Sequence, residues 1–231
     1  YEAAILDRVS ATLQWATVAH GSLSQIVITL GSDWLTVDNA LRQTTRGTQI
    51  PGAISPWECI QLAQRLAISV IDLCRQVAPV VAINEQGNHD AVLGSAVASI
   101  CAAWYRDCDD VEVRVRPCGD VWTAHEFHDV ALFGHHGHKR KPTQVAQTVA
   151  GMFAPIWGRC RFRYVMMGHR HHHQNFPLGD AGGVEIIQTR SPSAHTEYEH
   201  GLGFVDDAQT LESFIFQAGR GLVTHRRAMM A

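Results

Sequence analysis

The amino-acid sequence predicts an α/β protein, a two-layered β-sandwich flanked by helices. Its first half alternates amphipathic helical segments with short apolar runs, the order expected of strands joined by covering helices. Its second half consists mostly of short strand-like runs separated by turn residues. No internal repeat or low-complexity linker marks a boundary, so residues 1–231 are predicted to form a single domain.

The first half begins with a predicted helix in which Ile5, Val9 and Leu13 recur roughly on one face. The longer helix that starts at Pro56 carries apolar side chains three and four positions apart, and proline suits a first helical turn. The short runs between the helices are rich in branched apolar residues, which is typical of buried strands. The predicted helices are 2–20, 56–77 and 91–105, and the predicted strands are 25–30 and 80–84.

Short runs in the second half are predicted to form a second sheet. A helix is predicted at about 143–154, and the strand after it ends at the heptapeptide "MGHRHHH". The predicted strands of this half are 111–115, 121–127, 129–134, 163–168, 183–190, 201–207 and 212–219.

The composition is that of an ordinary globular chain, without the strong charge or long apolar runs that indicate binding to nucleic acid or membrane. A net charge of −3 and a pI near 6.5 exclude a global basic field, so any contact with nucleic acid must come from a local patch. No apolar run approaches the roughly 20 residues of a transmembrane helix, and the first residues, "YEAAILDRVS", lack the basic and hydrophobic regions of a signal peptide. The 6 cysteines form no CxxC pair, which favours reduced thiols in a cytoplasmic protein.

Histidine is distributed unevenly along the chain. The segment 167–173, "MGHRHHH", places four histidines in seven positions, and "HHGH" at 135–138 adds three more. A purification tag would lie at a terminus and run without interruption. The two remaining interpretations are a metal site and a solvated polar loop.

Four polar loops favour the metal site, because each directly follows a predicted buried strand. In open α/β folds, ligands and cofactors gather at the carboxyl ends of strands. Oxygen and imidazole ligands together suit Mn, Fe, Zn and similar divalent ions, and the absence of cysteine from these loops argues against a structural zinc finger. The side chains concerned are Asp33, Asn88, His89, His135, His136, His138, His169 and His171.

These loops read "GSD", "GNHD", "HGH" and "GHRH" in this order, and together they resemble the calcineurin-like metallophosphoesterase superfamily. The match spans residues 31–171. The surroundings, "GSDWLTVDN" and "TTRGT", look like the phage-type branch described as DNA-repair exonuclease-like. The resemblance implies the two-layered sandwich and, if a phage encodes the chain, a location in the host cytoplasm.

The resemblance also implies a role for each matching residue. Asp33 would bridge two divalent metal ions, with Mn²⁺ expected and Fe, Zn and Ni as alternatives. His171 would reach the first ion, and His89 would protonate the leaving oxygen. A hydroxide bridging the ions would attack phosphorus. The ligands of the second ion would be Asn88, His136 and His169.

The sequence departs from the family pattern near its start. The family's first motif, D-x-H, supplies ligands of the first metal, and no Asp in this sequence has His two positions later. We therefore expect the strand that carries this motif to lie upstream of Tyr1. The family's second carboxylate falls at Thr36 here, so the nearest acid, Asp38, is the candidate for orienting His89.

Each candidate also has an ordinary structural interpretation. Asp33 suits a turn or a helix cap, and His135 and His138 compete with His136 as the ligand. Charge runs are usually solvated, but Lys139 and Arg140 follow a proposed ligand closely enough to steer an anionic substrate. Arg46 is a similar candidate. Trp34, next to Asp33, suits either base stacking or the core.

Three hypotheses about function follow. The leading one is a dinuclear metal-dependent phosphoesterase that hydrolyses phosphodiester bonds in a nuclease-like reaction, on DNA or a nucleotide. The second is a phosphomonoesterase of small molecules or nucleotides. The third is a non-catalytic scaffold with the same fold. None of them involves a membrane, and none fixes the substrate, the native metal or the oligomeric state.

Overall fold

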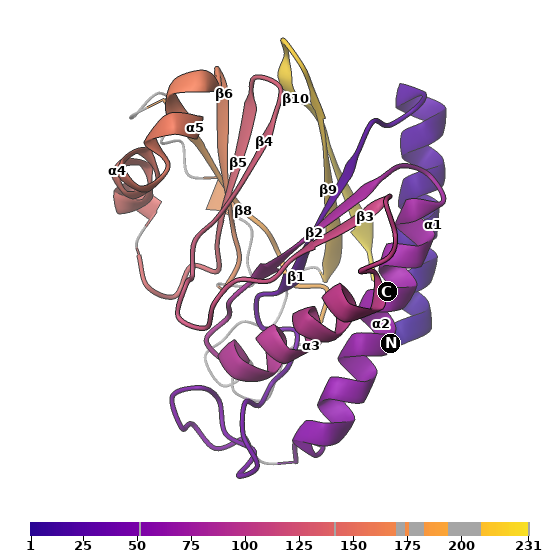
Figure 1. Cartoon of the computed structure of the whole chain (residues 1–231), viewed down its shortest axis with the longest axis vertical. Helices are drawn as coiled ribbons and strands as arrows, with labels where there is room; N and C mark the ends of the chain where they lie inside the picture. The colour runs from indigo at the N-terminus through magenta and orange to yellow at the C-terminus, as the bar shows by residue number, and fades with distance from the viewer. Residues whose placement is uncertain (51, 141, 170–173, 176–182, 194–208, 231) are drawn as a thin grey trace. The chain divides into compact units, whose positions relative to one another are not determined.

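The computed structural model describes residues 1–50, 52–140, 142–169, 174–175, 183–193 and 209–230. The chain has a mixed α/β fold that divides into two compact units, Tyr1–Thr123 and Ala124–Ala231 (Figure 1). The prediction that both halves form a single domain stays a prediction.

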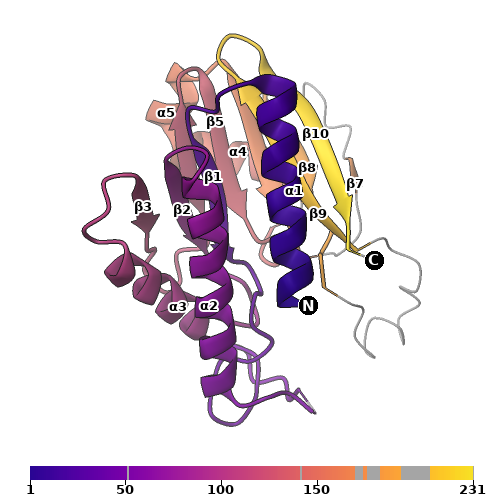
Figure 2. The same ribbon diagram turned by 90° about the vertical axis from the view of Figure 1, so that its right-hand side faces the viewer.

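The first unit is a three-stranded parallel sheet with helical connections. Its strands are β1 (Ile26–Gly31), β2 (Val80–Glu85) and β3 (Val111–Arg114), in the order β1-β2-β3. The helices are α1 (Glu2–His20), α2 (Pro56–Arg75) and α3 (Ala91–Trp104). Helices α1 and α2 contact each other and run side by side in Figure 2.

Local sequence explains where α2 begins. Ser55 caps α2 because its hydroxyl accepts the backbone N–H of Glu58 while the Glu58 carboxylate accepts the N–H of Ser55, a complete capping box. Every residue of β2 is buried, as expected for the central strand of a parallel sheet.

The strand at 111–115 was expected in a second sheet, and this expectation is wrong. β3 pairs in parallel with β2, from Val80 opposite Val111 to Ile83 opposite Arg114. The physical reason is α3, which connects β2 to β3 as the crossover that two parallel neighbours require. The alternation of apolar and charged residues along β3 reflects the position of this strand at the edge of the first sheet.

The second unit contains a five-stranded sheet and a separate two-stranded hairpin. The order in the larger sheet is β4-β5-β6-β8-β7, with β5 parallel to β6 and β6 parallel to β8. The elements are β4 (Thr123–Phe127), β5 (Val130–His135), α4 (Pro142–Met152), α5 (Ala154–Arg159), β6 (Phe162–Met167), β7 (Gln174–Asn175), β8 (Glu185–Gln188), β9 (Thr210–Gln217) and β10 (Gly221–Met229).

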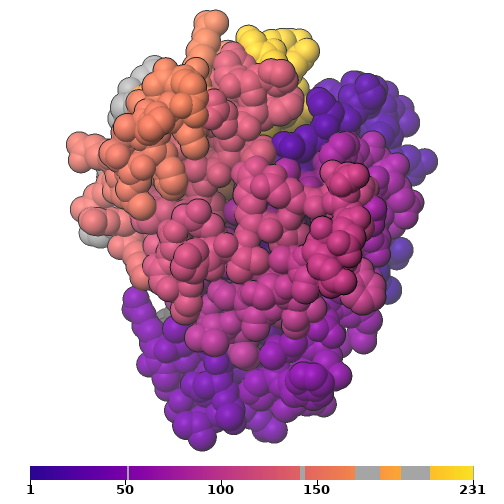
Figure 3. All heavy atoms as spheres, in the orientation of Figure 1, coloured from indigo at the N-terminus to yellow at the C-terminus, as the bar shows by residue number. Residues whose placement is uncertain are grey.

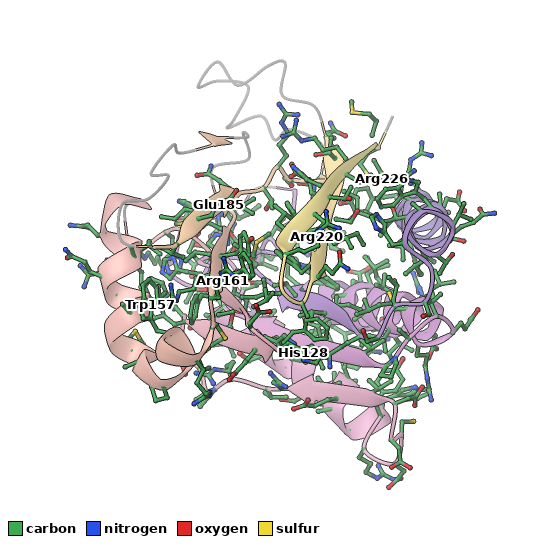
Figure 4. All side chains as sticks on the ribbon, turned by 90° about the horizontal axis from the view of Figure 1, so that it is seen from above. His128, Trp157, Arg161, Glu185, Arg220 and Arg226 are labelled. Atoms are coloured by element: carbon green, nitrogen blue, oxygen red, sulfur yellow. The ribbon has the colours of Figure 1, made fainter. Side chains whose placement is uncertain are left out.

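The hairpin of β9 and β10 packs on the larger sheet of its own unit. Phe214 and Phe216 of β9 contact a cluster that includes the buried side chains of Val130 and Tyr164. The Tyr164 hydroxyl accepts the backbone N–H of Leu222 at 2.8 Å. Figure 4 labels Arg220 at the turn of this hairpin and Arg226 further along β10.

Most predicted elements are confirmed with shifts of one to three residues. Helix α5 and strands β7 and β10 were not expected, and the strand predicted at 201–207 lies outside the described residues. All 6 cysteines lie in the described ranges without a disulfide, and 4 of them are buried. No helix among the described residues is long and apolar enough to cross a membrane.

Candidate metal centre

The polar loops of the first unit meet because the strands that carry them end together. β1 and β2 are parallel and in register, with Gly31 opposite Glu85 at their carboxyl ends. Asp33 follows one strand, and Asn88 and His89 follow the other. The Oδ1 atom of Asp33 accepts the backbone N–H of His89 at 2.8 Å. The structure therefore brings these three predicted residues into one group.

The backbone around Asp33 has an unusual conformation that fixed contacts maintain. Gly31, Ser32 and Asp33 all have positive φ, at 93°, 62° and 69°. This region costs about 1–2 kcal/mol for a residue with a Cβ, and aspartate tolerates it better than most. Ser32 is held twice by Glu85, whose backbone oxygen accepts its N–H and whose carboxylate accepts its hydroxyl. The turn presents Asp33 to the loop after β2.

Gly87, the first residue of "GNHD", is required by this close approach. A Cβ on Gly87 would lie 1.9 Å from Oδ1 of Asp33 and 2.5 Å from its backbone nitrogen. It would also lie 2.6 Å from Oδ1 of Asp90. Only glycine lets the Asp33 carboxylate reach this loop.

Asp90 is a residue of the site that the sequence interpretation missed. Its carboxylate is 1% exposed and accepts the backbone N–H of Asp33 at 3.2 Å and of Leu35 at 3.1 Å. A buried carboxylate is stabilised by such hydrogen bonds. Asp90 therefore holds the segment that carries Asp33. The sequence contained a sign of this role, because Asp90 is the acid that ends "GNHD" and it immediately precedes a predicted helix.

Asp38, predicted to orient His89, instead makes its described contacts with α3 and the preceding loop. Its Oδ1 accepts the backbone N–H groups of Val92 and Leu93 at 2.8 and 2.7 Å. Its Oδ2 accepts the hydroxyl of Thr45 at 2.8 Å. Asp38 thus caps the helix that begins two residues after His89, and the predicted direct contact between them finds no support among these bonds.

The second unit has a histidine cluster, His135, His136, His138 and His169, at the ends of β5 and β6. These strands are parallel, with His135 opposite Met167 at their carboxyl ends. The Nε2 atom of His136 lies 3.2 Å from Nδ1 of His169. The geometry therefore favours His136 as the partner of His169 among the three competing histidines.

Glycine again permits the close approach of two loops. Gly137 has φ of 110°, and a Cβ there would lie 3.0 Å from the backbone oxygen of Gly168 and 3.2 Å from Cβ of His169. The backbone N–H of Gly168 donates to the oxygen of His136 at 3.1 Å. The "HGH" and "GHRH" motifs are thereby joined through their backbones.

The other two histidines of the cluster, His135 and His138, have lowered pKa values. Nδ1 of His135 accepts the backbone N–H of Gly137 at 2.9 Å, which fixes the ring. Burial, and after it the nearby charge of His136, lowers the pKa of His135 to about 4 and that of His138 to about 3. Both rings are neutral near pH 7.

The donor atoms of the cluster fit a divalent metal ion. Neutral imidazole is the form that metals bind. Two nitrogen ligands about 2.1 Å from one ion lie roughly 3.0–3.4 Å apart in right-angled or tetrahedral arrangements. The observed separation of 3.2 Å between the nitrogens of His136 and His169 falls in this interval. An N–H···N hydrogen bond is the alternative account of the same distance.

The remaining predicted residues have less definite positions. His171 lies outside the described residues. Lys139 and Arg140 are exposed directly after the histidine cluster, and Arg46 is exposed in the loop between β1 and α2. These positions are compatible with the predicted steering role of the three cations, which stays a prediction.

No known family model matches the sequence, and no curated protein matches it either. The resemblance to the metallophosphoesterase superfamily therefore depends on the four motifs alone.

Proposed function

We propose that this protein is a dinuclear metal-dependent phosphoesterase that hydrolyses phosphodiester bonds. The observation that carries the proposal is the pair of imidazole nitrogens of His136 and His169, placed 3.2 Å apart at the ends of parallel strands. The group of Asp33, Asn88 and His89 at the ends of β1 and β2 supports it, because these side chains complete the same motif order.

In this proposal Asp33, Asn88, His136 and His169 bind one ion, and Asp33 and His171 contribute to the other. The ions, with Mn²⁺ expected, would supply activation of water and stabilisation of negative charge on the phosphoryl oxygens. The proposal also includes the finer fold assignment, a two-layered β-sandwich of the metallophosphoesterase type. It implies a phosphate-ester substrate and a cytoplasmic protein.

His89 is the residue that would transfer a proton. Its backbone N–H is anchored on the Asp33 carboxylate, so its imidazole starts from a fixed point beside the bridging ligand. An imidazole nitrogen, Nδ1 or Nε2, can donate a proton to a departing alkoxide.

The test compares hydrolysis of bis(p-nitrophenyl) phosphate, a diester, with that of p-nitrophenyl phosphate, a monoester, by the Mn²⁺-loaded protein. We expect faster turnover of the nitrophenyl diester. On a dithymidine monophosphate, whose leaving alkoxide needs a proton, we expect H89N to lose about 10²–10⁴-fold in kcat with little change in KM. The matched control is H20N, because His20 is exposed at the end of α1.

Other outcomes of this assay select the other hypotheses. Turnover of the monoester alone would favour a phosphomonoesterase. Turnover of neither substrate, or equal loss in H89N and H20N, would contradict the proposal and favour the scaffold.

A further inference from the structure

We propose that Trp34 and Arg46 form a binding surface for single-stranded nucleic acid on the first unit, and that such a polynucleotide is the substrate. This inference rests on the proposed function, because it names the substrate class of the same site. It concerns only contacts within the first unit.

Trp34 is an exposed indole held in place by its neighbours. The backbone N–H groups of Asp33 and Leu35, on either side of it, both donate to the Asp90 carboxylate. Leu35 is 3% exposed, whereas Trp34 is 36% exposed and has no ring contact among the described residues. About a third of the Trp34 surface is therefore open to a ligand. Trp34 directly follows Asp33, so the indole is attached one residue from the proposed ligand.

Arg46 lies at the tip of a short hairpin in the loop between β1 and α2. Gln43 and Gln49 pair across it, and the N–H of Gly47 closes the turn on the oxygen of Thr44 at 2.8 Å. Gly47 has φ of 86°, a conformation that glycine adopts without strain. This loop runs along the lower part of the first unit in Figure 1, and its indigo-to-purple atoms are at the surface in Figure 3.

The hairpin tip is tied to the loop that carries His89. The Thr45 hydroxyl donates to Asp38 at 2.8 Å and accepts the backbone N–H of Ala91 at 3.1 Å. Ala91 is two residues after His89, and Arg46 is the direct neighbour of Thr45. The backbone that carries the Arg46 side chain is therefore held close to the loop of His89, the proposed proton donor.

Arg46 is an exposed cation at the tip of this hairpin. It has no hydrogen bond or ion pair among the described residues. Arg42, at the base of the same hairpin, lies near Glu58, whose pKa is lowered by hydrogen bonds from Ser55 and also by the charge of Arg42. A guanidinium suits a phosphate, which it can bind through two parallel N–H donors.

The N-terminus of α3 does not offer an alternative phosphate site, because its first four N–H groups are already satisfied. Ala91 donates to Thr45, Val92 and Leu93 donate to Asp38, and Gly94 donates to the backbone oxygen of Asp90. Phosphate binding at this edge of the unit therefore depends on a side chain.

A single strand fits these features better than a duplex. An indole stacks on a base only when that base is unstacked from its neighbours. Duplex binding without a broad basic groove is weak, and the net charge of this chain is −3. One stacking side chain and one phosphate contact are the minimal elements of a sequence-tolerant single-strand site.

Binding is tested without metal, by fluorescence anisotropy of a labelled oligothymidylate of about ten nucleotides, within the usual range of site sizes. In EDTA we expect W34A to weaken binding about tenfold, whereas W34F retains most of the affinity. We expect R46A to weaken it about fivefold and to reduce the slope of log K against log salt by about 0.7. The matched controls are W104A and R106A, at the far end of α3.

Losses in W34A and R46A no larger than those in the two controls would overturn the inference. Equally tight binding of a duplex of the same length would also overturn it. The result is separable from the proposed function, because the assay does not require turnover. Hydrolysis of a small diester without oligonucleotide binding would refute this inference alone, and binding through Trp34 and Arg46 without any hydrolysis would refute the proposed function alone.

Discussion

Replacement of Gly87 by alanine should disrupt the group around Asp33 although it adds a single methyl group. The new Cβ would lie 1.9 Å from Oδ1 of Asp33, whereas real Cβ atoms essentially never come closer than 3.0 Å to another atom. The atoms must therefore separate by at least 3.0 − 1.9 = 1.1 Å. The Cβ would also lie 2.5 Å from the Asp33 backbone nitrogen, so rotation of one side chain does not relieve the overlap.

Overpacking of a buried site costs about 1–3 kcal/mol, and contact with fixed backbone atoms favours the upper end. For a chain of this size, about 3 kcal/mol corresponds to a decrease in Tm of roughly 6–12 °C. Urea denaturation followed by circular dichroism measures the loss, and Mn²⁺ content measures the effect on the proposed ligands. The control is G158A, because a Cβ there meets no atom within 4 Å. A G87A protein as stable and as rich in metal as G158A would refute the geometry.

Three further changes test other contacts. D90N leaves an amide N–H facing a backbone donor in a buried position, so we expect a loss of about 2–3 kcal/mol in urea denaturation; an unchanged midpoint would contradict the role of Asp90. T45V removes the hydroxyl that joins the hairpin to α3, and it should cost about 1–2 kcal/mol while the exposed control T48V costs less than 0.5 kcal/mol. Burial raises the pKa of Cys74 and Cys101 to about 11 from 9.0, so the folded chain retains thiol protons that the unfolded chain loses. Stability should therefore fall as the pH rises from about 9 to about 11, by up to about 1.4 kcal/mol per pH unit for each thiol, and a midpoint constant over this range in reducing buffer would contradict their burial.

The sequence predicted the elements of the site well, because strand and helix periodicities are local properties. The expectation that polar loops gather at strand ends is confirmed within each unit by the pairing of β1 with β2 and of β5 with β6. The parallel register brings the segment of Asp33 toward the loop of His89, and that of His136 toward His169.

The failures concern information that local patterns do not contain. The run at 111–115 alternates as an edge strand does in any sheet, so its sequence does not reveal that it pairs with β2. Asp38 and Asp90 are both acids near a helix start, and only the hydrogen bonds show that the former caps α3 and the latter holds Asp33. The need for glycine at position 87 likewise arises from a contact 54 residues away in the sequence, at Asp33.

The manganese content of the protein tests the proposed metal centre most directly. It is measured by elemental analysis after reconstitution with Mn²⁺ and removal of the excess. We expect the wild-type chain to retain manganese and H136A to retain about one ion per chain less. The control is H20N, which should retain the wild-type amount. A wild-type chain that retains no manganese, or an H136A variant that retains as much as H20N, would contradict the assignment of this site as a metal centre.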